Sequence, residues 1–329
     1  MPDSAPMPDS TRKTAIVTGA TSGLGLEAAA QLGQADYARV TITGRSEERA
    51  EAARAQLVAR TGRDVFETLV LDLNKPQSVS AAAEELVRRG QKFDFLLLNA
   101  GMVSGGELVK TAEGIEVTSA SSLIGHHQLT MQMIEDDLLF DHAHIVIAGS
   151  EAARGDVPTF KPVDLSDFAA KSHDGDLAVA AEALLRYDPP QKYKPATAYS
   201  NAKLFVAYWS AELAHRLPTG TTVNAVSPGS APDTGAARNA NFFMKRILLP
   251  FFQLVPGKAA TTPVAASRYI EASAYPEQVT GQFFASAPKK MIGDLHKVDL
   301  PHVADRESQA AAWDAIVKVA GGVDYPVAA

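Results

Sequence analysis

The chain has 329 residues, of which 46% are hydrophobic and 21% charged, and its formal net charge at pH 7 is −7. This length allows one large domain with a substantial core, and the negative charge argues against a protein whose main task is to bind nucleic-acid phosphates or anionic lipid. The chain has no cysteine, which excludes disulfides, thiolate metal ligands and cysteine nucleophiles.

The first twelve residues, MPDSAPMPDSTR, are polar and rich in proline and predict a disordered leader. They lack the apolar core of a signal peptide, and no run in the chain reaches about 18 consecutive apolar residues. We therefore expect a cytoplasmic protein without stable membrane insertion, in which residues 13–329 form one domain.

Short apolar runs alternate with alanine-rich helical patterns along most of the chain. The expected strands are Ala15–Thr18, Arg39–Thr43, Glu67–Leu71, Phe93–Leu98, His144–Ala148 and Thr222–Val226, with helices such as Glu47–Ala59 and Ser78–Arg89 between them. This alternation predicts an α/β fold with a doubly wound parallel sheet. Because the runs are apolar throughout, helices should cover both faces of the sheet.

A glycine-rich segment follows the first expected strand, in the sequence VTGATSGLGLEAAAQLG (Val17–Gly33). Its glycines let the backbone turn sharply and approach a ligand, and the free amides of the next helix attract phosphate, so a pyrophosphate is the expected occupant. A tight turn without a ligand is the alternative. The expected cofactor-binding residues of this loop are Gly19, Thr21, Ser22, Gly23, Leu24 and Gly25.

The second strand ends at TITGRS, where a cofactor with a free ribose 2′-hydroxyl would call for an acidic residue. Arg45 stands there instead. A guanidinium at this place pairs with a 2′-phosphate, which favours NADP over NAD. The alternative is an exposed arginine that only begins a helix.

Two regions interrupt the alternation. Residues 154–197, rich in Asp, Lys and Pro, are expected to form an insert with an amphipathic helix at Asp176–Tyr187 that ends before Pro189 and Pro190. Residues 230–257 contain FFMKRILLPFFQLVPG and predict an apolar lid over a substrate pocket, with a membrane-touching patch as the alternative.

Tyr199 and Lys203 form the only Y-x-x-x-K pattern in the chain, and on a helix their side chains share one face. A nearby ammonium and the positive ring of an oxidised nicotinamide would lower the pKa of the phenol from about 10. Tyr199 would then protonate a carbonyl oxygen during reduction. Alone, such a pair also fits an ordinary helix surface.

Several motifs together resemble the short-chain dehydrogenase/reductase superfamily, from about Lys13 to at least Gly281. They are TGATSGLG (Thr18–Gly25), LDL (Leu71–Leu73), LLLNAG (Leu96–Gly101), AYSNAK (Ala198–Lys203) and SPG (Ser227–Gly229). The chain is most similar to the retinol dehydrogenase and protochlorophyllide reductase-like branch, through GRSEERAEAA and ESQAAAWDAIVKVAGG. The resemblance implies a Rossmann-type, single-domain, NADP-dependent oxidoreductase with an insert before the tyrosine helix.

The resemblance also implies roles for individual residues. Ser150 would hydrogen-bond the reacting oxygen beside Tyr199, and Lys203 would also hold the nicotinamide ribose. Asp72 and Leu73 would flank the adenine. The ribose side would be lined by Asn99, Ala100 and Gly101, and the nicotinamide end by Pro228, Gly229 and Thr234.

Ser122 departs from the family pattern, which usually has asparagine at this place in a phrase like N-x-x-G-H. The resemblance implies that the backbone carbonyl of this residue holds a water linked to the lysine, and that the asparagine side chain steadies a local kink. A serine keeps the carbonyl. Either the proton relay survives with a looser kink, or the pocket serves another chemistry; a shifted helix register is a third interpretation.

No metal site is expected. Neighbouring histidines such as His126 and His127 point apart on a helix, and neither this pair nor His142 with His144 has a third ligand at a convincing spacing. We expect structural or surface roles for all four.

The leading functional prediction is an NADP-dependent carbonyl reductase or alcohol dehydrogenase that acts on a small or medium apolar molecule. The alternatives are double-bond reduction or non-redox cyclisation on the same fold, and an NADP(H)-binding sensor without catalysis. Ser150 and Tyr199 are 49 positions apart, more than in compact relatives. We expect the insert to cover the usual dimer face and leave a monomer; if it only lengthens the pocket rim, a dimer forms.

Overall fold

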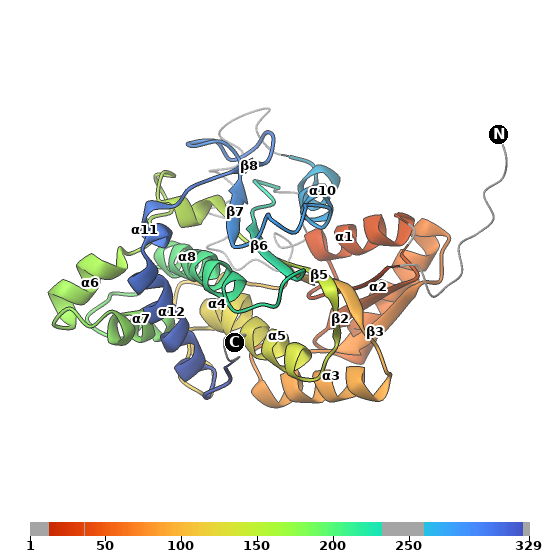
Figure 1. The fold of residues 1–329 in the computed structure, drawn as a ribbon, viewed down its shortest axis with the longest axis horizontal. Helices are drawn as coiled ribbons and strands as arrows, with labels where there is room; N and C mark the ends of the chain where they lie inside the picture. Colours follow the sequence, from red (N-terminus) through yellow and green to blue (C-terminus); the bar gives the residue numbers. More distant parts are fainter. Residues whose placement is uncertain (1–12, 36, 232–259, 325–329) are drawn as a thin grey trace.

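A single sheet forms the centre of the computed structural model, which describes residues 13–35, 37–231 and 260–324 (Figure 1). Its strands are β1 (Thr14–Val17), β2 (Arg39–Gly44), β3 (Phe66–Val70), β4 (Phe93–Leu98), β5 (Leu139–Ala148), β6 (Thr222–Val226), β7 (Gln282–Ala285) and β8 (His296–Lys297). The order across the sheet is β3-β2-β1-β4-β5-β6-β7-β8. Every neighbouring pair is parallel except β7 with β8. The predicted doubly wound parallel sheet is therefore confirmed.

Helices cover both faces of the sheet, and each face has its own apolar core. One face carries α1 (Gly23–Gln34), α2 (Glu47–Thr61) and α10 (Thr262–Ala272). The other carries α3 (Pro76–Arg88), α5 (Gly125–Glu135), α8 (Pro195–Ala214) and α12 (Arg306–Val319). The strands between them are apolar on both sides because both sides are covered.

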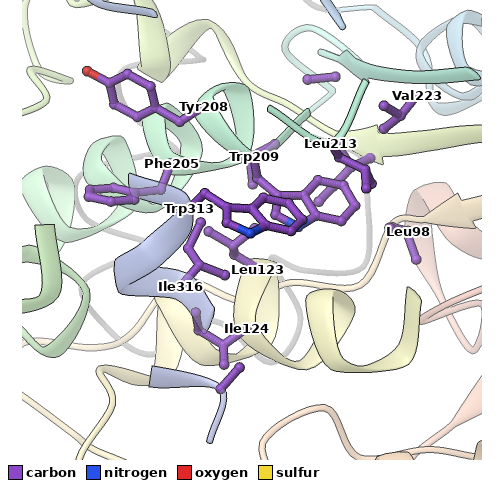
Figure 2. Packing of buried hydrophobic residues seen from close by; sticks show 14 of the residues in the cluster. Leu98, Leu123, Ile124, Phe205, Tyr208, Trp209, Leu213, Val223, Trp313 and Ile316 are labelled. Atoms are coloured by element: carbon purple, nitrogen blue, oxygen red, sulfur yellow. The ribbon is translucent and has the colours of Figure 1, made fainter. Parts of the chain in front are cut away.

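The core on the α8 side includes both tryptophans of the chain, Trp209 on α8 and Trp313 on α12 (Figure 2). The indole nitrogen of Trp209 donates a hydrogen bond to Nδ1 of His127 over 3.1 Å, and the His127 ring meets the edge of Trp313 at a centroid distance of 5.2 Å. α12 thus packs against α5, and it also packs against α8.

Residues 154–197 contain two helices, α6 (Leu165–Ser172) and α7 (Leu177–Arg186), after a 3₁₀ turn, η3 (Glu151–Arg154). α7 is the amphipathic helix predicted from the sequence. Asp176 caps its start by accepting a hydrogen bond from the Val179 amide, and Tyr187 ends it in the left-handed region at φ 56°. α7 packs against α12.

The helix before β5 is divided by an irregular turn. A short segment, α4 (Val117–Ser119), leads into a π-helical turn, η2 (Ala120–Ile124), which leads into α5. The turn η2 places Ser122 next to the end of the sheet where the candidate site lies.

A short helix, α11 (Pro301–Ala304), precedes α12.

Two predictions concern residues that the structure does not describe: the leader at residues 1–12, and nearly all of the lid at residues 230–257, which includes Thr234. Within the described ranges, no helix has both the length and the apolar character needed to cross a membrane.

Candidate active site

A cavity of about 560 Å³ opens between the carboxyl ends of β1 and β4, where the order of successive strands in the sheet reverses. Ligands of open α/β sheets bind at such a switch point. Gly19, at φ +65°, and Gly25 lie on its wall. A Cβ atom on Gly25 would lie 2.6 Å from the Gly19 carbonyl oxygen and would strike the Asn99 amide, so this turn accepts no side chain there.

The first turn of α1 faces this cavity. Ser22 precedes the helix in extended conformation, and its side chain makes no capping hydrogen bond. Gly23, Leu24 and Gly25 follow it on the cavity wall. Because the first amides of a helix have no partner within the helix and carry partial positive charge, this turn suits a diphosphate.

Two arginines lie at the end of the cavity next to β2. Arg45 directly follows β2, and Arg49 lies one helical turn further, in α2. Both side chains are exposed, and within the described ranges neither forms an ion pair. The two guanidiniums are therefore free to meet an anionic group of a ligand.

The loop after β4 is fixed to the end of β1 by hydrogen bonds. Asn99 donates its side-chain amide to the Thr18 carbonyl over 3.0 Å, and the Ala100 amide donates to the Thr18 hydroxyl over 3.0 Å. Asn99, Ala100 and Gly101 all line the cavity, as do Asp72 and Leu73 after β3. The structure thus gathers these sequence-predicted residues along one wall.

Ser150, Tyr199 and Lys203 meet at the carboxyl end of β5. The Lys203 Nζ atom donates a hydrogen bond to the Ala148 carbonyl over 2.7 Å and lies 5.9 Å from the centre of the Tyr199 ring. Ser150 caps η3 by accepting a hydrogen bond from the Ala152 amide over 3.2 Å, and its side chain is close enough to Tyr199 to lower the pKa of the phenol. Tyr199 and Lys203 line the cavity, and Phe160 packs edge-on against the Tyr199 ring at a centroid distance of 5.8 Å.

Burial dominates the proton equilibria of this group. It raises the pKa of Tyr199, a shift that the Ser150 hydrogen bond opposes and the Glu151 carboxylate increases. Burial lowers the pKa of Lys203 to about 8. In the chain alone the net shift of the Tyr199 pKa is therefore upward, whereas the sequence predicted that Lys203 together with an oxidised cofactor would lower it.

A sequence model of the short chain dehydrogenase family matches residues 13–163. The dehydrogenase/reductase SDR family member 13 of Bos taurus is 30% identical over 315 residues, which are 94% of this chain and 73% of that protein. The chain belongs to the short-chain dehydrogenase/reductase family.

Other relatives agree with the branch indicated by the sequence. Human retinol dehydrogenase 14 is 28% identical over 92% of this chain and 84% of its own. The chloroplastic protochlorophyllide reductase of Chlamydomonas reinhardtii is 25% identical over 94% of this chain and 78% of its own. A WW domain-containing oxidoreductase of Drosophila melanogaster is 29% identical over 78% of this chain, which spans 58% of the length of that relative.

Solved structures share the fold. An uncharacterised protein of Mycobacterium paratuberculosis superposes with a TM-score of 0.68 at 22% identity, over 97% of each chain. A short chain dehydrogenase of Burkholderia cenocepacia, solved in complex with NADP, superposes with a TM-score of 0.57 at 24% identity, over 83% of this chain and 94% of that one.

Ser122, where this short-chain dehydrogenase/reductase departs from the family asparagine, lies in the π-helical turn η2. Its carbonyl lies 3.2 Å from Nδ1 of His126, and the other ring nitrogen of His126 lies 2.9 Å from the Thr18 hydroxyl. The Ser122 hydroxyl is buried, has no hydrogen-bond partner among the described residues and faces the Gly101 backbone. The helix is thus π-helical at this place, and His126 links the turn to the end of β1.

Three further residues belong to the site although the sequence prediction omitted them. Arg49 lines the cavity, and its signal was the second arginine of GRSEER, one helical turn after Arg45. Tyr269 on α10 also lines the cavity, and Glu151 lies buried behind Tyr199. Neither of these two belongs to a motif, so only the fold could identify them.

One predicted cofactor residue lies behind the cavity wall. Pro228 lines the cavity, whereas Gly229 turns away at φ +76° and packs against Arg268 and Met291.

The histidines have local partners. His127 contacts the Val323 carbonyl, His142 lies 3.1 Å from Asp94, and His144 lies 2.9 Å from the Thr222 hydroxyl. In the described part of the chain, no three histidine or acidic side chains gather as metal ligands would.

Proposed function

We propose that this protein is an NADP-dependent oxidoreductase that reduces the carbonyl group of a small or medium apolar molecule, or oxidises the corresponding alcohol. The observation that carries the proposal is the arrangement within one cavity. Tyr199 and Lys203 lie at one end, with the side chain of Ser150 next to Tyr199, and the amides of α1 with Arg45 and Arg49 lie at the other. Its volume suits a bound dinucleotide.

The residues of the cavity fit a phosphorylated nicotinamide dinucleotide. The open amides at the start of α1 would hold the diphosphate, and Arg45 with Arg49 would hold the 2′-phosphate. When bound, the cofactor supplies the hydride. The NADP-bound Burkholderia structure supports the fold only, so the preference for NADP rests on the two arginines.

The proposed proton donor is Tyr199. Because burial raises its pKa, the phenol keeps its proton at neutral pH and is ready to donate it to a developing alkoxide. The Ser150 hydroxyl, whose side chain lies next to Tyr199, would donate a hydrogen bond to the same substrate oxygen. Phe160 and Val157 are buried and pack against Tyr199, so they support its ring from behind the cavity wall.

A screen of aldehydes and ketones of increasing size tests the proposal directly. Purified protein is mixed with NADPH and each compound, and the cofactor absorbance is followed. We expect steady loss of absorbance with at least one apolar carbonyl compound. NADPH binding without turnover of any carbonyl compound would favour the binding-protein alternative.

A second candidate function, double-bond reduction or cyclisation, is favoured by the unpartnered hydroxyl of Ser122. We expect Ser122→Asn to keep or raise carbonyl reduction, because asparagine is usual at this place in the family and the backbone carbonyl is retained. The measurement is kcat/KM on the best carbonyl substrate, with circular dichroism to confirm the fold. A marked loss of activity in a folded variant would favour a pocket rebuilt for the second chemistry.

We expect a monomer. In most relatives the outer faces of the helices that correspond to α5 and α8 pair with a second subunit. Here α12 packs on α8, and Gln128 on α5 donates a hydrogen bond to the Ala320 carbonyl at the end of α12. α7 of the insert packs against α12. We therefore propose that α12, against which the insert packs, covers the outer faces of α5 and α8, rather than the insert alone.

Light scattering coupled to gel filtration measures the assembly. The expected mass is close to that of one chain, 34.9 kDa. A stable dimer or tetramer at micromolar concentration would show that another face of the molecule is used.

A further inference from the structure

A buried carboxylate lies directly behind the candidate catalytic group. Glu151 follows Ser150 in η3 and is 2% exposed. Its Oε2 atom accepts a hydrogen bond from the Ser227 hydroxyl over 2.5 Å, and its Oε1 atom accepts one from the Ser286 hydroxyl over 3.0 Å and one from the Ser286 amide over 3.2 Å. One side chain thus joins the ends of β5, β6 and β7.

Arg268 on α10 completes this network. It is 5% exposed, and its Nη1 atom lies 3.6 Å from the Glu151 carboxylate. Nη1 donates to the Ser227 carbonyl over 3.1 Å, and Nη2 donates to the Ser286 hydroxyl over 3.0 Å. The guanidinium therefore contacts the same two serines as the carboxylate, and its Nη2 atom also donates to the Gly293 carbonyl over 2.5 Å.

The loop Ser227–Gly229 is shaped by this pair. The Gly229 amide donates to the Ser227 hydroxyl over 3.1 Å, the same hydroxyl that donates to Glu151. A Cβ atom on Gly229 would lie 2.8 Å from Nη1 of Arg268, so the loop closes directly over the guanidinium. Pro228 at the centre of the loop and Tyr269 beside Arg268 both line the cavity.

We propose that Glu151 and Arg268 are a positioning pair for the reaction, which fixes the loop Ser227–Gly229 and the start of η3 so that the nicotinamide end of the cavity and Ser150 stay in place beside Tyr199. This inference rests on the proposed function. Apolar residues of similar volume often stabilise a core as well as a buried ion pair does, so stability alone does not explain such a pair. A buried ion pair whose groups are all hydrogen-bonded does fix the geometry of the chain segments that it joins.

The pair also has an electrostatic consequence. The ionisable groups near Tyr199 are Lys203 on its own helix, Glu151 on η3 and Tyr269 on α10, and Arg268 on α10 pairs with Glu151. The negative charge of Glu151 raises the pKa of Tyr199. Glu151 therefore holds the proton on the proposed acid up to higher pH.

The test compares Glu151→Gln with Arg268→Lys in the full chain, with NADPH and the best carbonyl substrate. Reduction needs protonated Tyr199, so its rate falls as the pH rises through the Tyr199 pKa. Removing the Glu151 charge lowers that pKa, and we expect the falling limb of kcat/KM to move to lower pH by about 0.5 to 1 unit. Arg268→Lys keeps the charge, but a lysine cannot donate to the Ser227 carbonyl, the Ser286 hydroxyl and the Gly293 carbonyl together. The falling limb of kcat/KM should therefore stay in place, while KM for NADPH rises severalfold.

Arg154→Gln is the matched control from the same turn. Arg154 donates to the carbonyls of Ser286, Ala287 and Lys290, so its loss should lower the melting temperature. Arg154 pairs with Asp156 and is not among the groups that shift the pKa of Tyr199, so the falling limb of kcat/KM should not move. A purely structural role of Glu151 predicts that Glu151→Gln behaves like Arg154→Gln, with a lower melting temperature and an unmoved limb.

The outcomes separate this inference from the proposed function. Suppose that Tyr199→Phe is inactive, that Glu151→Gln has the wild-type falling limb of kcat/KM, and that Arg268→Lys has the wild-type KM for NADPH. The proposed positioning pair is then wrong, and the proposed function stands. If Tyr199→Phe is fully active, the proposed function fails first. If Glu151→Gln does not fold, Arg268→Lys decides, because an unchanged KM for NADPH in that variant overturns the proposal.

Discussion

Replacing Tyr199 by phenylalanine is expected to lower the rate of carbonyl reduction by a factor of about 10² to 10⁴, the usual contribution of a positioned general acid. The change removes one hydroxyl and keeps the ring that packs against Phe160. Loss of one neutral hydroxyl contact costs about 1 kcal/mol of stability, so the variant should fold and bind NADPH as the wild type does. Single-turnover rates and NADPH titration of the same preparation measure both properties.

Two further tyrosines provide the controls. Tyr208 lies on the same helix and is buried, but it is not among the residues that line the cavity. Tyr208→Phe should therefore keep the wild-type rate. Tyr269 does line the cavity and is the competing candidate for the acid. Loss of reduction in Tyr269→Phe together with retained reduction in Tyr199→Phe would transfer the role to Tyr269.

The sequence predicted the elements whose burial is uniform. β4 and β6 have the predicted bounds, because every residue of β6 and all but one of β4 are buried, and this gives an unbroken apolar run. β5 begins five residues earlier than predicted. Its first half, Leu139–Ala143, has exposed residues with a charged Asp141 among them, so no apolar run marks it.

The edge of the sheet beyond β6 could not be predicted in the same way. β7 has four residues and β8 has two, and β8 is exposed. Strands this short carry too little hydrophobic pattern to distinguish them from loops. They form because β6 offers a free edge and because the Ser286 end of β7 is bound by Glu151 and Arg154.

The residues of the candidate site also differ in how far the sequence could predict them. Residues in local motifs, such as Arg45 in TITGRS or Tyr199 and Lys203 in AYSNAK, were predictable because a helix turn or a strand end fixes their spacing. Glu151 and Arg268 belong to no motif and lie far apart in the chain, so their meeting depends on the order of β5, β6 and β7. Site residues that come together from different strands can be identified only from the folded structure.

Substituting Arg45 by aspartate is expected to weaken NADPH binding by about one to two decades. Arg45 is exposed at the end of β2, lines the cavity and has no ion-pair partner within the described ranges. Loss of one charge-assisted contact to the 2′-phosphate costs about 1.5 to 3 kcal/mol, which gives that factor in the dissociation constant. NADH lacks this phosphate, and an aspartate at this place can accept a hydrogen bond from its ribose hydroxyl, so NADH should bind as well as before or better.

Calorimetric titration of both cofactors into wild type, Arg45→Asp and Arg88→Asp measures this change in preference. Arg88 is the matched control, because its substitution changes the net charge equally while its side chain pairs with Glu85 on α3, outside the cavity. Both cofactors should bind Arg88→Asp as they bind the wild type. Arg49→Ala then separates the contributions of the two arginines. Equal affinity of the wild type for NADPH and NADH would contradict the proposed preference, because a guanidinium that meets no 2′-phosphate cannot distinguish the two.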